Sequence, residues 1–242
     1  QIGFSSRMHI TRAEATLTDI QTNGFSVWGG YKGNTVFDGR KVTFTNSAWS
    51  YEPTEYWTYN IYDFHGVYPT PDANSTDKNY TVTWNNTTKA LNITGFDSSS
   101  GIDLLHSPLT GLDGSNTNIS GKPLVMNFNH ILTNVNVELV KAADVHDIII
   151  TQVAIYGLYT KGDYSWTKEN ALWDTYTDES SIPYIRKEID NIPLIVKSDD
   201  ANDNYGYTSI ISDVLCIPQN INENSIYLVV AYDFKLNTKT AA

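Results

Sequence analysis

Apolar and polar residues alternate along one long stretch near the middle of the chain, from Leu124 to Val140. From Leu124 to Leu132 every second residue is a candidate for one buried face, a period typical of a half-buried strand. After Thr133 the alternation resumes in the opposite phase, from Val135 to Leu139. A regular strand cannot change the parity of its apolar face without turning that face to solvent. We therefore predict a bulge or corner near Thr133-Asn134, where the strand bends or passes between two sheets.

The same alternation, interrupted by Gly, Asn and Pro, predicts strands over most of the chain. A four-residue loop at 85–88 predicts a hairpin, and one short helix is expected over 165–177, with Trp166 and Trp173 on one side. Many short strands with almost no helix predict an all-β fold built of β-sandwiches. The predicted strands are 2–10, 25–31, 40–45, 59–68, 80–84, 89–94, 124–140, 146–159, 192–197, 209–218 and 225–236.

The segment from Gly111 to Pro123 is rich in Gly, Asn and Ser and poor in apolar residues. Such a composition favours a linker. The 242 residues are enough for two ordinary domains with their own cores. We therefore expect an N-terminal β-sandwich domain over 1–118 and a C-terminal one over 122–242.

Charge, apolar runs and cysteine content argue against several partners and roles. The formal net charge is -11, and no basic cluster offsets it, which argues against nucleic acid and anionic membrane surfaces as partners. No stretch approaches the roughly 20 apolar residues of a membrane span. The single cysteine, Cys216, lies in an apolar strand, where a buried and inert thiol is expected.

No residue pattern predicts a catalytic or metal centre. The five histidines show no H-x-H or H-E-x-x-H spacing, and His130, on the apolar face of the central stretch, is expected to be a core residue. The segment 199–206 resembles a calcium loop, but Tyr205 stands where the glycine belongs and Ile211 where the bidentate glutamate belongs. An acidic surface loop is the better interpretation. We expect no cofactor, no metal and no enzymatic activity.

Four segments, in order, resemble those of the Bacteroidetes fimbrillin-like proteins, the subunits of surface fimbriae. Residues 128–137 are similar to the family's Phe-x-His-x-Leu-x-x-Val-x-Val segment. Trp49-Ser-Tyr51 with the strand 61–69 ending in Tyr-Pro, Asp103-Leu-Leu105, and 213–219 ending in Ile-Pro-Gln match its other motifs. The motif residues expected in the core are Phe128, His130, Leu132, Leu215, Ile217 and Pro218.

The resemblance implies two tandem β-sandwich domains of transthyretin-like type and a non-enzymatic structural or adhesive subunit of cell-surface fimbriae. It implies an exported chain with a lipid anchor upstream of Gln1 at the outer membrane. Its partners would be other fimbrial subunits and a host or bacterial surface ligand. Assembly would follow strand exchange, in which a protease cuts after an arginine, the first strand leaves, and another subunit's strand fills the groove. Stalk, anchor and tip roles are all compatible with these motifs.

Two features locate this mechanism on the chain. The first strand carries Ile2, Phe4, Met8 and Ile10 at alternating positions, so these are the side chains that a displaced strand would withdraw. Arg12 follows in a polar Thr-Arg-Ala-Glu context suited to an accessible loop, and we predict it as the maturation site.

The C-terminal strand departs from the family pattern. Its apolar residues alternate cleanly from Ile226 to Leu236, and no Trp- and Tyr-bearing segment follows it. We expect this strand at an open sheet edge, which is prone to pairing with another chain. Either this sequence ends before the family's further segment, or this subunit receives a partner strand instead of donating one. The alternative function is a surface carbohydrate-binding module, for which some of the six tryptophans would have to be exposed. Trp28, Trp49, Trp57 and Trp84 lie in or beside predicted strands, where core packing is the default.

Overall fold

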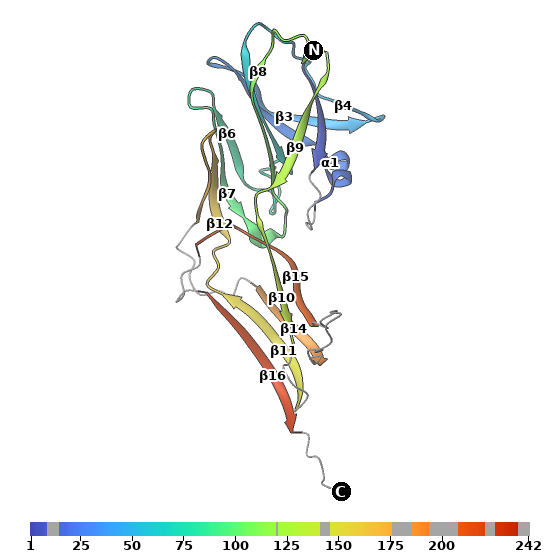
Figure 1. The fold of residues 1–242 in the computed structure, drawn as a ribbon, viewed down its shortest axis with the longest axis vertical. Coiled ribbons are helices and arrows are strands. Elements are labelled where there is room, and N and C mark those ends of the chain that lie inside the picture. The colour runs from blue at the N-terminus through green and yellow to red at the C-terminus, as the bar shows by residue number, and fades with distance from the viewer. Residues whose placement is uncertain are drawn as a thin grey trace, which may run out of the picture. The chain divides into compact units, whose positions relative to one another are not determined.

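The computed structural model describes residues 1–8, 15–119, 121–140, 146–175, 185–193, 208–220 and 226–236 (Figure 1). Within them the chain is all-β, apart from helix α1 (Leu17–Asn23) and a 3-10 turn at Ser98–Ser100. The chain forms two compact units, each described by itself below. The first unit comprises Gln1–Thr133, Thr160–Tyr176 and Ile217–Gln219, and the second comprises Asn134–Tyr159, Thr177–Cys216 and Asn220–Ala242.

The first unit is built on a seven-stranded sheet. Its segment Gln1–Thr133 begins and ends in this sheet, with β1 and β9. β1 pairs in parallel with β9, and the neighbouring strands in the rest of this sheet pair antiparallel. In spatial order the strands are β1 (Gly3–Met8), β9 (Pro123–His130), β8 (Leu105–Asp113), β5 (Ile61–Tyr68), β2 (Phe25–Tyr31), β3 (Asn34–Thr45) and β4 (Ala48–Ser50).

The main core of this unit lies on the inner face of the curled sheet. Phe4 of β1 contacts Phe37 of β3 with ring centroids 5.3 Å apart, and Phe25 of β2 contacts Phe128 of β9 at 5.1 Å. These rings come from strands near opposite ends of the sheet order, so the sheet bends until its ends face each other. Gly66 of β5 is needed at this bend, because a Cβ there would lie 2.9 Å from the Met126 side chain.

A four-stranded sheet packs on the other face of β5 and β8. It consists of β13 (Ala171–Thr175), β12 (Lys161–Trp166), β7 (Ala90–Asp97) and β6 (Thr81–Asn85), all antiparallel. The predicted hairpin around residues 85–88 is confirmed, because β6 and β7 pair as Asn85 with Ala90. The helix expected over 165–177 is wrong: Trp166 and Trp173 lie on two strands of a hairpin, where Trp173 pairs with Tyr164.

Helix α1 was not predicted, although its start carries a recognisable signal. The Thr16 backbone N–H donates to the Asp19 carboxylate at 2.7 Å, and the Asp19 N–H donates to the Thr16 hydroxyl at 3.3 Å, which together form a capping box. The helix ends at Gly24, whose φ of 76° is open to glycine and strained for other residues. Its buried Ile20 packs into the main core of the first unit.

The second unit has two small sheets that face each other across a core. One sheet pairs β10 (Thr133–Leu139) with β15 (Thr208–Cys216), and the other has the order β14 (Ile185–Pro193), β11 (His146–Tyr156), β16 (Tyr227–Leu236). Ile150 and Val153 of β11 pack against Ile210 and Ile211 of β15. The predicted open edge is confirmed for the described strands, because β16 is the last strand of its sheet.

The central stretch confirms the predicted change of sheet at Thr133. β9 buries Leu124, Met126 and Phe128 in the first unit, and β10 begins at Thr133 and pairs with β15 of the second unit. The parity of the apolar face changes because the chain passes from one core to the other. The sequence pattern therefore marked a real transition.

The expected division into 1–118 and 122–242 differs from the structure. Its boundary falls beside β9, which belongs to the large sheet of the first unit because it pairs with β1 and β8. The segment taken for a linker instead ends β8 and forms the turn before β9, where the Gly114 N–H donates to the Asn60 carbonyl at 2.9 Å. The first unit extends to Thr133, and the β12–β13 hairpin from the second half of the chain also belongs to it.

Candidate functional site: the first strand and its surroundings

The first strand is an edge strand whose apolar side chains are buried or partly buried. Ile2 is fully buried, Phe4 is 3% exposed, and Met8 packs partly buried against the same core. Phe4 meets Phe37 and Phe64 edge-to-face, with centroids 5.3 and 5.5 Å apart. The burial predicted for Ile2 and Phe4 is confirmed. The predicted positions Ile10 and Arg12 lie outside the described residues.

The start of β1 is held by the segment that joins β4 to β5. The Ile2 N–H donates to the Glu55 carbonyl at 2.8 Å, and the Tyr51 hydroxyl donates to the Ile2 carbonyl at 2.6 Å. The same hydroxyl accepts the Glu55 N–H at 3.3 Å. The Trp-x-Tyr motif marked Tyr51 as a residue of interest in the sequence. No sequence pattern indicated that its hydrogen-bond partner would be Ile2.

A second anchor holds the chain where it enters α1. The Ala15 N–H donates to Asp103 Oδ2 at 3.2 Å, and His130 Nδ1 lies 2.6 Å from the same oxygen. Burial raises the pKa of the Asp103 carboxyl, while His130 and the Ala15 N–H oppose that rise. Two residues of the family motifs, Asp103 and His130, thus fix the backbone on the C-terminal side of the segment that contains Arg12.

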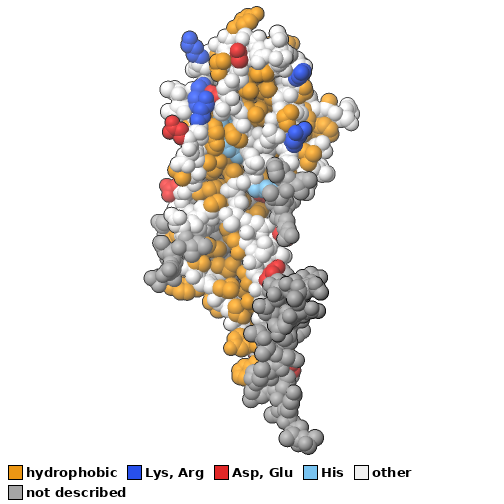
Figure 2. Space-filling model, viewed as in Figure 1, with side chains coloured by type: hydrophobic (Ala, Val, Ile, Leu, Met, Phe, Trp, Pro, Cys, Tyr) orange, Lys and Arg blue, Asp and Glu red, His pale blue; other side chains and the backbone are white. Residues whose placement is uncertain are grey.

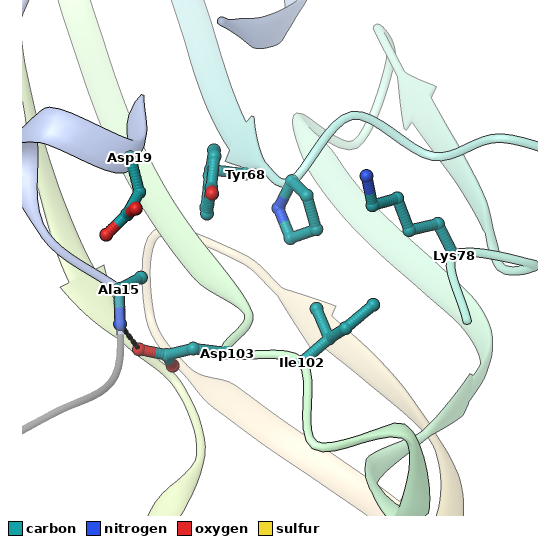
Figure 3. Close-up of a pocket in the computed structure, with 7 residues that line it drawn as sticks. Ala15, Asp19, Tyr68, Lys78, Ile102 and Asp103 are labelled. Carbon is teal, nitrogen blue, oxygen red and sulfur yellow. Dashed lines mark hydrogen bonds between the residues drawn. The ribbon is translucent and has the colours of Figure 1, made fainter. Parts of the chain in front are cut away.

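A pocket of about 190 Å³ lies beside this anchor (Figure 3). Figure 3 shows Asp19 of α1 and Asp103 on either side of Ala15, with Tyr68 and Lys78 across the opening. Both carboxylates have partners within the fold, since Asp19 closes the capping box and Asp103 accepts the Ala15 N–H. The arrangement therefore serves to position the chain. The residues that line the pocket are Ala15, Asp19, Tyr68, Pro69, Lys78, Ile102 and Asp103.

A third polar cluster is buried between the two sheets of the first unit. His65 Nδ1 and His106 Nε2 lie 2.9 Å apart, so one of these nitrogens donates a hydrogen bond to the other. His106 Nδ1 lies 3.3 Å from the Tyr164 hydroxyl. Trp84 and Trp166 each pack on the His65 ring at 4.7 Å. Burial lowers the pKa of His106 to about 3, and burial with the neighbouring His106 lowers the pKa of His65 well below its usual value.

The other motif residues predicted for the core fall in both units. Phe128 is fully buried, Leu132 is 9% exposed, and Ile217 is 1% exposed, all in the first unit. Leu215 is buried in the second unit, whereas Pro218 is only partly buried. The His130 side chain is 13% exposed and pairs with Asp103, so its expected structural role is supported by its contacts. Cys216 is buried, and burial raises the pKa of its thiol to about 11.

The described residues offer neither a metal site nor a membrane-spanning helix. Among them no group of three His, Cys, Asp or Glu side chains is arranged to hold a metal ion. No helix in the described part of the chain is long and apolar enough to cross a membrane. The loop 199–206, interpreted as an acidic surface loop, lies outside the described residues.

Comparison with solved structures identifies a similar fold. A fimbrial protein from Bacteroides vulgatus superimposes with a TM-score of 0.70 at 19% identity, over 96% of this chain and 83% of that one. A candidate cell adhesion protein from Bacteroides ovatus gives a TM-score of 0.42 at 13% identity, over 88% of this chain and 76% of that one. No curated protein sequence matches this chain.

A family model described as fimbrillin-like matches residues 11–241, nearly the whole chain. The match includes all four segments in which the sequence resembles that family, and the fold agrees with that of a fimbrial protein. The chain therefore belongs to the fimbrillin-like family.

Proposed function

We propose that this chain is a structural subunit of cell-surface fimbriae that joins its neighbours by strand exchange. Cleavage after Arg12 separates β1 from the rest of the chain, and a strand of another subunit takes its place. The observation that carries the proposal is the position of β1. It is the first strand of the described residues, it pairs only with β9 among the described strands, and its Phe4 and the preceding Ile2 are buried in the core.

The physical basis of the exchange is β-augmentation. The backbone of an incoming strand would pair with β9, and its alternate side chains would fill the positions of Ile2 and Phe4. The anchor at Ala15 supports this mechanism, because Asp103 would keep the rest of the chain in place after β1 leaves. In this proposal the two units are transthyretin-like sandwiches, as the resemblance to the family implies.

The second unit supports a role in contacts with neighbouring subunits. One face of β16 carries large apolar side chains that are only partly covered. Val230 on this face packs against the core of the second unit, whereas Leu228, Tyr232 and Phe234 on the same face are 50%, 55% and 60% exposed. Figure 2 shows hydrophobic side chains along this part of the surface. An apolar edge strand favours pairing with another chain, so we assign β16 to a contact with a second subunit.

We propose that the protein lies outside the cell, at the surface or the outer membrane, and that a lipid anchor upstream of Gln1 holds it there. Membership in the fimbrillin-like family supports the cell-surface location. An adhesive subunit would also bind a host or bacterial surface ligand. Trp28 is buried and the other five tryptophans are partly buried, which disfavours the carbohydrate-binding alternative in the form that needs exposed tryptophans.

Limited digestion with an arginine-specific protease tests the proposal. We expect the first cut after Arg12, and we expect a synthetic strand from a neighbouring subunit to raise the melting temperature of the cut protein. Arg12→Lys is the matched control, because it keeps the charge and removes the cleavage site. A first cut at Arg40 or Arg186, or no thermal shift with any candidate strand, would contradict strand exchange. A glycan array tests the carbohydrate-binding alternative.

A further inference from the structure

The backbone of Ile2, at the start of β1, is bound by groups outside the sheet. Both main-chain groups of Ile2 are bound by the segment between β4 and β5, the N–H by the Glu55 carbonyl and the carbonyl by the Tyr51 hydroxyl. These bonds are additional to the pairing with β9, which begins at Gly3. A residue in this position therefore needs a free N–H, which proline lacks.

The Tyr51–Glu55 contact is also held by residues outside β1. The Tyr51 ring packs against Phe37 of β3 at 5.1 Å, as well as against Phe4 of β1 at 5.8 Å. Arg40 Nη1 donates to the Pro53 carbonyl at 2.8 Å and to the Glu55 carboxylate at 2.9 Å. Since burial raises the pKa of the Tyr51 hydroxyl, this group stays a hydrogen-bond donor at neutral pH.

The two side chains that follow occupy distinct environments. The Ile2 position is fully enclosed, and the Phe4 position is formed by aromatic rings that meet Phe4 edge-to-face. The position of Gly3 between them does not require glycine, because a Cβ there would lie 3.5 Å from Pro123, which is an ordinary contact. The groove thus favours an aliphatic residue, then any residue compatible with a strand, then an aromatic residue.

We propose that Tyr51 and Glu55 form a selection site for the strand that takes the place of β1. The partner is an extended segment that runs parallel to β9, with an aliphatic residue other than proline at the position of Ile2 and an aromatic residue two positions later. The inference rests on the proposed strand exchange and specifies its partner. Tyr51 acts here as a positioning residue that sets the register of the incoming strand.

Peptide binding to the protein cut at Arg12 and freed of its first strand tests this selection. The peptide is the chain's own residues 1–12 with a fluorescent label, and binding is measured by anisotropy. We expect N-methylation of the Ile2 nitrogen to weaken binding about tenfold, because one hydrogen bond is lost and the Glu55 carbonyl is left unpaired. A Phe4→Ala peptide should bind at least about a hundredfold more weakly, whereas an Arg7→Lys peptide, altered at an exposed position, should bind unchanged.

Variants of the protein test the same contact from the other side. Tyr51→Phe removes the hydroxyl and should weaken binding about tenfold, while Tyr59→Phe, at a tyrosine that is 92% exposed, should have no effect. In the uncut protein, Tyr51→Phe should speed hydrogen exchange of the Ile2 amide, and Tyr59→Phe should not. Equal binding of the unmodified peptide to both variants, with no loss on N-methylation, overturns the selection site. Failure of every peptide to bind, the chain's own strand included, overturns strand exchange itself and the selection site with it.

Discussion

The buried histidine pair should make the first unit sensitive to mild acid. In the unfolded chain a histidine takes up a proton below about pH 6.5. In the folded chain His106 stays neutral until about pH 3, because it is buried beside His65 and Tyr164. Between these values the unfolded state binds the extra proton, so the free energy of unfolding falls as the pH falls.

The size of the effect follows from the shift in pKa. Each unit of pH between the two pKa values removes about 1.4 kcal/mol. From pH 6.5 to pH 5 the loss from His106 is about 2 kcal/mol, and His65 adds to it in the same direction because its pKa is also lowered. A domain of ordinary stability, about 5–15 kcal/mol, would lose a substantial fraction of it.

Urea unfolding at several pH values, followed by tryptophan fluorescence, measures this loss. All six tryptophans lie in the first unit, so the signal reports on that unit alone. His106→Gln replaces the titrating ring with a neutral amide and should flatten the dependence by about 2 kcal/mol between pH 6.5 and pH 5. Groups elsewhere that titrate in this range contribute equally to both proteins and cancel in the comparison. An identical pH dependence in the two proteins would refute the reasoning.

Three further outcomes are expected. Gly66→Ala should destabilise the first unit by about 1–3 kcal/mol in the same unfolding assay, because its Cβ would meet Met126 and Phe128 within about 3 Å; Gly3→Ala, where an added Cβ would make only an ordinary contact with Pro123 at 3.5 Å, should cost less. The Cys216 thiol should react with a disulfide reagent at pH 8 only after unfolding, because it is buried with a raised pKa; rapid reaction of the native protein would contradict this. Asp103→Ala should leave the Ala15 N–H unpaired and cost about 1–3 kcal/mol, with faster proteolysis before α1; unchanged stability and proteolysis would show that the anchor has no effect.

The alternation of apolar and polar residues was sufficient to predict features that are set by residues close together in the chain. The parity change at Thr133, the hairpin at 85–88 and most strands follow from the period of two and from turn residues, which are set within a few positions of the chain. The seven-residue helix α1 is too short to show a helical period, and only its Thr16-Asp19 capping signal marks it.

Features that depend on distant residues were not predictable in this way. The hydrogen bond from Tyr51 to Ile2 spans 49 residues and that from Ala15 to Asp103 spans 88. Alternation shows which face of a strand is buried but carries no information on which strand lies beside it. For the same reason the β12–β13 hairpin could not be assigned to the first unit, since only its pairing with β7 places it there.

The order in which the chain is made has a consequence for this arrangement. The first unit needs Thr160–Tyr176 to complete its four-stranded sheet, and it also includes Ile217–Gln219. Until that part of the chain has been synthesised, β7 lacks its partner β12, and the apolar side chains that β12 covers stay accessible. A growing chain therefore cannot finish its N-terminal unit first, as chains with consecutive domains do. The first unit can be completed only after residue 219 has been synthesised, and chaperones that hold extended chains have that interval in which to act.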